Sequence, residues 1–216
     1  MKIQFNNIVE KSKADGPGER VVLFVQGCSL ACPGCQSPHL WPALLGKAEE
    51  VRDVANRIMK LVSPDKFVTL SGGEIMQQPE AIAELIWTLR QRGAQHIIAY
   101  TGYRWEEMHN PSHPARPWLK EILSGLDILV DGRFIKAQDD PFIMWRGSRN
   151  QRPINVPATL AAGKIITHDW DAPRALIGPD GTIVVSEGMA RELAGKALGQ
   201  IRRTRICGEA QAETEK

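Results

Sequence analysis

Three cysteines within eight residues constrain this chain more than any other feature of its sequence. Cys28, Cys32 and Cys35 follow directly on an apolar run, whereas the fourth cysteine, Cys207, stands far away. A disulfide framework would normally use spread, even-numbered cysteines in a short secreted chain, so the clustered thiols indicate a metal site instead. We expect Cys207 to be a free thiol.

The cysteine spacing leaves two kinds of metal site open. Thiolates are the usual ligands of iron–sulfur clusters, and a cubane held by three of them keeps one iron without a protein ligand. An open coordination position is also what separates catalytic from structural metal sites. The alternative is a structural zinc ion, because His39 lies four residues after Cys35 and completes a chemically possible set of three thiolates and one imidazole.

The pattern around the cysteines predicts an α/β fold. Four short apolar runs have the length of buried strands, at 21–25, 67–70, 97–100 and 126–130. Apolar residues at helical spacing separate them, over 48–62 and in the stretch that begins at Pro79. Strands that alternate with helices form parallel βαβ units, and there are too few units here for a complete eight-stranded barrel. We therefore expect a partial barrel or an open α/β sheet.

The C-terminal part of the sequence changes character. We expect a core domain over 1–170 and a hairpin and helix over 171–207, because two apolar runs flank the turn sequence Gly-Pro-Asp-Gly at 178–181. The polar residues 208–216 are expected to form a disordered tail.

Charge and hydropathy narrow the classes of partner. Lysine plus arginine (27) nearly balances aspartate plus glutamate (25), which gives no electrostatic reason to expect nucleic acid or an anionic membrane. No apolar run approaches the roughly 20 residues that a membrane span needs. The first ten residues lack the apolar stretch of a secretion signal, so we expect a cytoplasmic protein.

A second candidate site is the turn Ser71-Gly72-Gly73-Glu74, which closes the predicted strand 67–70. Ligands of parallel α/β folds gather outside such strand ends. Two glycines let a ligand approach the backbone closely, and a carboxylate can accept hydrogen bonds from a ligand ammonium group. The alternative is a simple turn before a helix.

Several sequence blocks in order resemble the activating enzymes of anaerobic ribonucleotide reductases, a radical S-adenosylmethionine family similar to the pyruvate formate-lyase activases. The resemblance covers about residues 1–157. The blocks that carry it are DGPG at 15–18, RVVLFVQGC at 20–28, CPGC at 32–35, LSGGE at 70–74, YTGY at 100–103, LVDG at 129–132 and RGSRNQR at 146–152.

The resemblance implies a partial (β/α)6 barrel and a 4Fe-4S cluster whose open iron binds S-adenosylmethionine. An electron from flavodoxin or a similar donor would reduce the cluster and cleave S-adenosylmethionine to methionine and a 5′-deoxyadenosyl radical. That radical would take hydrogen from a glycine of a partner, the glycyl-radical reductase. By this resemblance Cys28, Cys32 and Cys35 hold the cluster, Gly34 and Gln36 touch the nucleoside, and Gly72, Gly73 and Glu74 bind the methionine ammonium.

The chain departs from the family pattern in two places. Gln36-Ser37 stands after the third cysteine where the family usually carries His-Asn or Tyr-Asn, and the segment after about residue 170 matches no part of the short activases. Two other functions therefore stay open. One is a radical S-adenosylmethionine enzyme that modifies a small molecule or another peptide, and the other is a non-catalytic zinc-binding module.

Overall fold

The computed structural model describes residues 1–140, 143–170, 175–177 and 183–185 of this 216-residue chain. The chain divides into two compact units, one formed by Met1–Pro141 with Trp145–Asp169 and the other by Phe142–Met144 with Trp170–Lys216. In the second unit, strands β8 (Ala175–Ile177) and β9 (Ile183–Val185) pair antiparallel. The predicted turn at 178–181, the predicted helix and tail that follow, and Cys207 lie outside the described residues.

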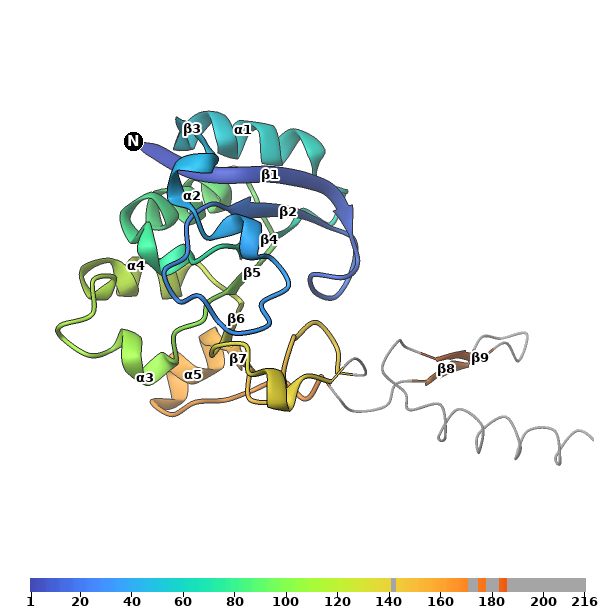
Figure 1. Cartoon of the computed structure of the whole chain (residues 1–216). Helices are drawn as coiled ribbons and strands as arrows, with labels where there is room; N and C mark the ends of the chain where they lie inside the picture. The colour runs from blue at the N-terminus through green and yellow to red at the C-terminus, as the bar shows by residue number, and fades with distance from the viewer. Residues whose placement is uncertain (141–142, 171–174, 178–182, 186–216) are drawn as a thin grey trace, which may run out of the picture. The chain divides into compact units, whose positions relative to one another are not determined.

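The strands of the first unit form one sheet in the order β3-β1-β2-β4-β5-β6-β7 (Figure 1). Its centre is parallel and consists of β2 (Arg20–Val25), β4 (Phe67–Gly72), β5 (His96–Tyr100) and β6 (Ile128–Asp131). Both sides are antiparallel: β1 (Lys2–Ser12) pairs with β2 and with β3 (Lys47–Glu50), and β7 (Arg152–Asn155) pairs with β6. The predicted α/β fold with a parallel core is confirmed.

Helices pack on one face of this sheet because their apolar stripes match its buried side chains. They are α1 (Val51–Leu61), α2 (Pro79–Gln91), α3 (Trp105–Met108), α4 (Leu119–Ser124) and α5 (Val156–Ala162). Short 3-10 turns lie at Pro38–Leu40 (η1), Ala43–Leu45 (η2), Ile75–Gln77 (η3), Arg116–Trp118 (η4) and Lys136–Gln138 (η5). The buried apolar side chains of strands and helices join in one core. None of the helices in the described ranges is long and apolar enough to cross a membrane.

Loops rather than helices close part of the opposite face. The Thr69 hydroxyl donates to the Asp15 carbonyl at 2.9 Å, and the Tyr100 hydroxyl donates to the Trp145 carbonyl at 2.8 Å. Gly16 has a φ of 135°, and a Cβ there would lie 2.8 Å from the end of Ile98. The segment around Gly16 therefore lies directly on the strands, in a conformation that favours glycine.

Four loops follow the carboxyl ends of the parallel strands and therefore lie at the same end of the sheet. β2 leads into the cysteine loop, β4 into the Gly-Gly-Glu turn, β5 into residues 101–104, and β6 into residues 132–135. Ligand sites of open α/β sheets lie outside these carboxyl ends. Both candidate sites predicted from the sequence therefore lie at the carboxyl ends of the parallel strands.

Candidate functional site

Hydrogen bonds shape the cysteine loop, which lies between β2 and η1. The Cys28 N–H donates to the Trp41 carbonyl at 3.0 Å, which fastens the start of the loop to the residue that follows η1. The Cys35 N–H donates to the Cys32 carbonyl at 3.1 Å, so these two cysteines share a turn. The Ser37 N–H donates to the Cys35 sulfur at 3.4 Å. Hydrogen bonds to the sulfurs are one of the features that set the reduction potential of iron–sulfur sites.

The three thiols fit a cluster by their chemistry. Cys28, Cys32 and Cys35 are free and partly exposed. Burial raises the pKa of the Cys28 thiol, and metal binding would remove its proton. Within the described ranges, no three His, Cys, Asp or Glu side chains form a group that could hold a metal ion, the set with His39 included. A cubane does not need its thiolates to meet at one ion, because each binds a different iron atom.

The Gly-Gly-Glu turn is hydrogen-bonded to the backbone that leads into the cysteine loop. The Gly73 N–H donates to the Val25 carbonyl and the Glu74 N–H to the Gly27 carbonyl, both at 2.8 Å. A Cβ on Gly73 would lie 2.4 Å from the Gly27 oxygen, and one on Gly72 would lie 2.6 Å from the Val25 nitrogen. Close backbone packing thus requires both glycines, a reason that the sequence analysis did not give.

The Glu74 carboxylate lies inside the wall of the site, with the residue only 1% exposed. Its Oε1 accepts hydrogen bonds from the Met76 N–H at 2.8 Å and the Thr101 hydroxyl at 2.7 Å, and its Oε2 accepts one from the Gly102 N–H at 2.7 Å. Burial raises the pKa of Glu74 to about 6, although these donors oppose the shift. The side chain therefore ties the end of β4 to the end of β5.

Replacing Glu74 with glutamine should destabilise the fold as well as the site. The glutamine amide group would face at least one of the three donors, and a buried donor without an acceptor costs about 1–3 kcal/mol. Urea unfolding measures the loss, with Glu10→Gln on the exposed part of β1 as the control. Equal stability of the two variants would contradict the bonding role of Glu74.

The raised pKa of Glu74 also predicts how the free energy of unfolding depends on pH in the parent chain and in Glu74→Gln. Its folded pKa of about 6 lies above the ordinary value of 4.5, so the folded chain holds this proton more tightly than the unfolded chain. The stability contributed by protonated Glu74 is therefore complete below the unfolded pKa and is lost as the pH rises through the folded pKa. The Glu74→Gln variant should lack this fall in the free energy of unfolding.

A pocket of about 630 Å³ opens beside the cysteine loop. Small-molecule sites commonly measure about 300–1,000 Å³. The apolar part of its wall consists of Leu30, Pro33, Phe134 and Ile135, and the polar part includes Cys32, Arg104, Arg133, Glu106, Glu107 and Asn150. Charges of both signs beside apolar side chains suit a zwitterionic ligand with an apolar body.

The predicted binding residues take different places around this pocket. Cys32 lines it, as does Gly102, which is bonded to Glu74. Gly34 lies against the segment after β6, where a Cβ would come within 3.2 Å of the Phe134 ring. Gln36 is exposed on the loop. Gly72, Gly73 and Glu74 do not line the pocket.

A buried carboxylate fixes the polar wall. Asp131 is fully buried and accepts from Nε and Nη2 of Arg152 at 2.9 and 2.5 Å, and from the Trp105 N–H at 2.7 Å. Arg152 also donates to both oxygens of Glu106, at 3.1 and 2.9 Å. These hydrogen bonds raise the pKa of Arg152 and lower that of Glu106. Arg152 thus holds Glu106 of the pocket wall to the ends of β6 and β7.

The sequence analysis missed two cations of the pocket, Arg104 and Arg133. Each lies close behind a predicted strand, the first after 97–100 and the second after 126–130. Charged residues just beyond the carboxyl ends of parallel strands are natural candidates for ligand contacts, because those ends meet at one edge. This positional signal could have identified both arginines.

Comparison with known proteins decides between the two metal sites that the cysteine spacing left open. Residues 14–154 match a family described as a 4Fe-4S single cluster domain. The anaerobic ribonucleoside-triphosphate reductase-activating protein of Enterobacteria phage T4 is 31% identical over 156 residues, which cover 69% of this chain and 92% of the relative. The protein of the same name from Escherichia coli K12 is 30% identical over 145 residues, or 63% and 88%.

The similarity of this chain to a solved structure is weaker than its similarity to these relatives. QueE from Escherichia coli aligns with a TM-score of 0.41 and 18% identity over 47% of this chain and 53% of that chain. The family match covers the whole cysteine loop and all four parallel strands. This chain belongs to the 4Fe-4S single cluster domain family and is a radical S-adenosylmethionine enzyme related to the anaerobic ribonucleoside-triphosphate reductase-activating proteins.

Proposed function

We propose that this enzyme activates an anaerobic ribonucleoside-triphosphate reductase by forming a glycyl radical on it. The observation that carries the proposal is the loop with three thiols beside a pocket of about 630 Å³, at the carboxyl edge of the parallel strands. The names of relatives at 30–31% identity support the choice of partner.

Cys28, Cys32 and Cys35 would bind three irons of the cluster and leave the fourth for S-adenosylmethionine. When bound, the cluster would supply one-electron chemistry: with an electron from flavodoxin or a similar donor, S-adenosylmethionine would be cleaved to methionine and a 5′-deoxyadenosyl radical, which would take a hydrogen atom from a glycine of the partner. The loop's hydrogen bonds at Cys28 and Cys35 would keep the thiolates in place during this transfer.

The remaining site residues would bind and orient S-adenosylmethionine. Gly72, Gly73 and Glu74 would receive the methionine ammonium, and Gly34 and Gln36 would contact the nucleoside. A carboxylate offers about four acceptor positions. The described hydrogen bonds of Glu74 use three of them. Because Glu74 is 1% exposed and does not line the pocket, the turn would have to open for the ammonium to reach the fourth.

The pocket wall would complete the site. Arg104 and Arg133 supply positive charge for a carboxylate, while Leu30 and Phe134 supply apolar surface. Excluding water protects a reactive intermediate from side reactions. The wall would therefore both hold the zwitterionic end of the cosubstrate and shield the radical until the partner's glycine arrives.

The test is an anaerobic reconstitution with iron and sulfide, followed by dithionite, S-adenosylmethionine and the anaerobic reductase of the same organism. We expect 5′-deoxyadenosine and methionine in equal amounts, and a glycyl-radical signal on the reductase by electron paramagnetic resonance. Cleavage that never produces the radical signal would reject the reductase as partner and favour a small molecule or another peptide. A reconstituted cluster without any cleavage would reject the proposed chemistry.

A further inference from the structure

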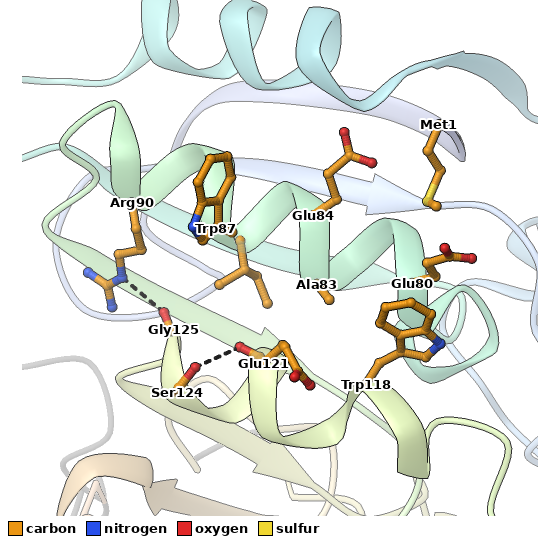
Figure 2. A pocket seen from close by; sticks show the side chains of 11 residues that line it. Met1, Glu80, Ala83, Glu84, Trp87, Arg90, Trp118, Glu121, Ser124 and Gly125 are labelled. Carbon is orange, nitrogen blue, oxygen red and sulfur yellow. Dashed lines mark hydrogen bonds between the residues drawn. The ribbon is translucent and has the colours of Figure 1, made fainter.

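A second hollow lies on the outer helical layer and shares no lining residue with the pocket beside the cysteine loop. It lies along α2 and α4, has a volume of about 520 Å³ and is open to solvent (Figure 2). We call it the α2–α4 groove. Its apolar lining consists of Met1, Ala83, Ile86, Trp87, Trp118 and Gly125.

Trp87 dominates the apolar surface of this groove. Its chain neighbours Ile86 and Thr88 are buried, yet Trp87 itself is 64% exposed. Tryptophan carries a large apolar area and is enriched among the residues that dominate binding energy in protein interfaces. Its position in the groove therefore indicates that covering this surface would contribute favourably to the binding of a partner.

The charged residues of the groove that form no ion pair with a lysine or arginine are acidic. Glu80, Glu84 and Glu121 line the groove, and no ion pair joins any of them to a lysine or arginine in the described part of the chain. Arg90 also lines it, but its guanidinium is engaged by the Asp127 carboxylate at 2.6 Å and the Gly125 carbonyl at 2.9 Å. The Met1 ammonium donates a hydrogen bond to Glu50 at 2.9 Å and also attracts Glu84 and Glu80. An occupant thus meets more negative than positive charge along the lining.

The shape of the groove suits a helix. A Cβ on Gly125 would lie 2.2 Å from Cγ2 of Ile86, so the end of α4 packs tightly against α2. The surface furrow along two packed helices is the kind of groove into which an amphipathic helix lays its apolar face. Figure 2 shows Trp87 and Glu84 on α2 with Glu121 across on α4, so apolar and acidic contacts lie within reach of one docked segment.

We infer that the α2–α4 groove docks a basic amphipathic helix of a protein partner. That helix would cover Trp87 with an apolar side chain and set lysine or arginine against Glu84 and Glu121. The three glutamates disfavour an anionic lipid surface or a nucleic acid, because like charges repel. The inference does not depend on the proposed radical chemistry, since no residue of the groove belongs to that site.

The test uses the full chain and a labelled amphipathic helix of leucine and lysine, about 18 residues long so that it can form a stable helix. A leucine and glutamate peptide of the same pattern is the control ligand. Fluorescence anisotropy should show binding of the lysine peptide, weakened about tenfold by Glu84→Lys with Glu121→Lys. Trp87→Ser should weaken it by a similar factor without changing the charge.

Glu10→Lys with Glu19→Lys, at two positions outside the groove, controls for the same change in the net charge of the chain. The inference holds if this control pair binds the lysine peptide like the parent chain. It fails if the control pair loses as much affinity as the groove pair, or if the glutamate peptide binds equally well. It also fails if light scattering finds a dimer that only the groove substitutions dissociate, because the occupant is then a second copy.

Discussion

Replacing Cys35 with alanine should leave the reconstituted protein without its 4Fe-4S cluster and without S-adenosylmethionine cleavage. The family match specifies one cluster, and three thiols on one loop already leave one iron free. Without Cys35 only two protein ligands would hold the whole cubane. The Ser37 N–H would also lose the sulfur to which it donates at 3.4 Å. Iron content, the visible absorbance of the cluster and the yield of 5′-deoxyadenosine measure the outcome.

Cys207→Ala is the matched control, because it removes the same thiol from a position far from the loop in sequence. We expect it to keep both the iron content and the yield of the parent chain. An equal loss of iron in the two variants would mean that Cys207 also binds the cluster. Normal iron in Cys35→Ala would remove Cys35 from the ligand set.

The parallel core could be predicted because its strands carry the signal within themselves. β2 is buried along nearly its whole length, so it appears in the sequence as an uninterrupted apolar run. β3 carries no such signal. Its sequence Lys-Ala-Glu-Glu consists of good helix formers, and it is a strand because it pairs with Lys2–Phe5 at the edge of the sheet. Tertiary pairing here outweighs local propensity.

The same distinction holds for the site: its local features could be predicted from the sequence, and its contacts between distant residues could not. The cysteines could be found because all three ligands lie on one short loop. The bonds from Glu74 to Gly102 and from Arg152 to Asp131 span 28 and 21 residues. The first exists only once the parallel strands β4 and β5 bring their carboxyl ends together, and the second only once β7 pairs antiparallel with β6 and sets Arg152 beside Asp131. No local sequence pattern therefore predicts them. Trp87 is a similar case, because helical spacing predicts its place on α2 but not its exposure to solvent.

A buried cation lies at the opposite end of the strands from the cysteine loop. Arg20 begins β2 and is 1% exposed. Its Nε donates to the Thr69 hydroxyl at 2.7 Å, and Nη2 donates to the Val68 carbonyl at 2.7 Å. Nη1 donates to the Pro17 carbonyl at 2.9 Å, and Nη2 also donates to the His96 carbonyl at the start of β5 at 3.3 Å. Burial lowers the pKa of Arg20 to about 10, so it remains charged at neutral pH. One guanidinium thus joins three segments of the chain.

Arg20→Met should therefore lower the free energy of unfolding by about 3–5 kcal/mol, because buried acceptors lose their donor and the methionine thioether cannot replace it. Arg20→Lys should recover part of the loss, since one ammonium cannot span acceptors on three segments. Arg52→Met, on the exposed side of α1, is the control and should change stability by less than about 0.5 kcal/mol. Urea unfolding compares all three variants.

The same substitution should leave the radical site intact, because Arg20 lies at the amino end of the strands and the cysteine loop follows their carboxyl ends. Below the unfolding transition, Arg20→Met should bind the same amount of iron as the parent chain. Burial and the Arg20 charge also lower the pKa of His96, so the variant should raise that pKa in a histidine titration by nuclear magnetic resonance. An unchanged His96 pKa together with an unchanged free energy of unfolding would show that this guanidinium does not hold the amino ends of β2, β4 and β5 together.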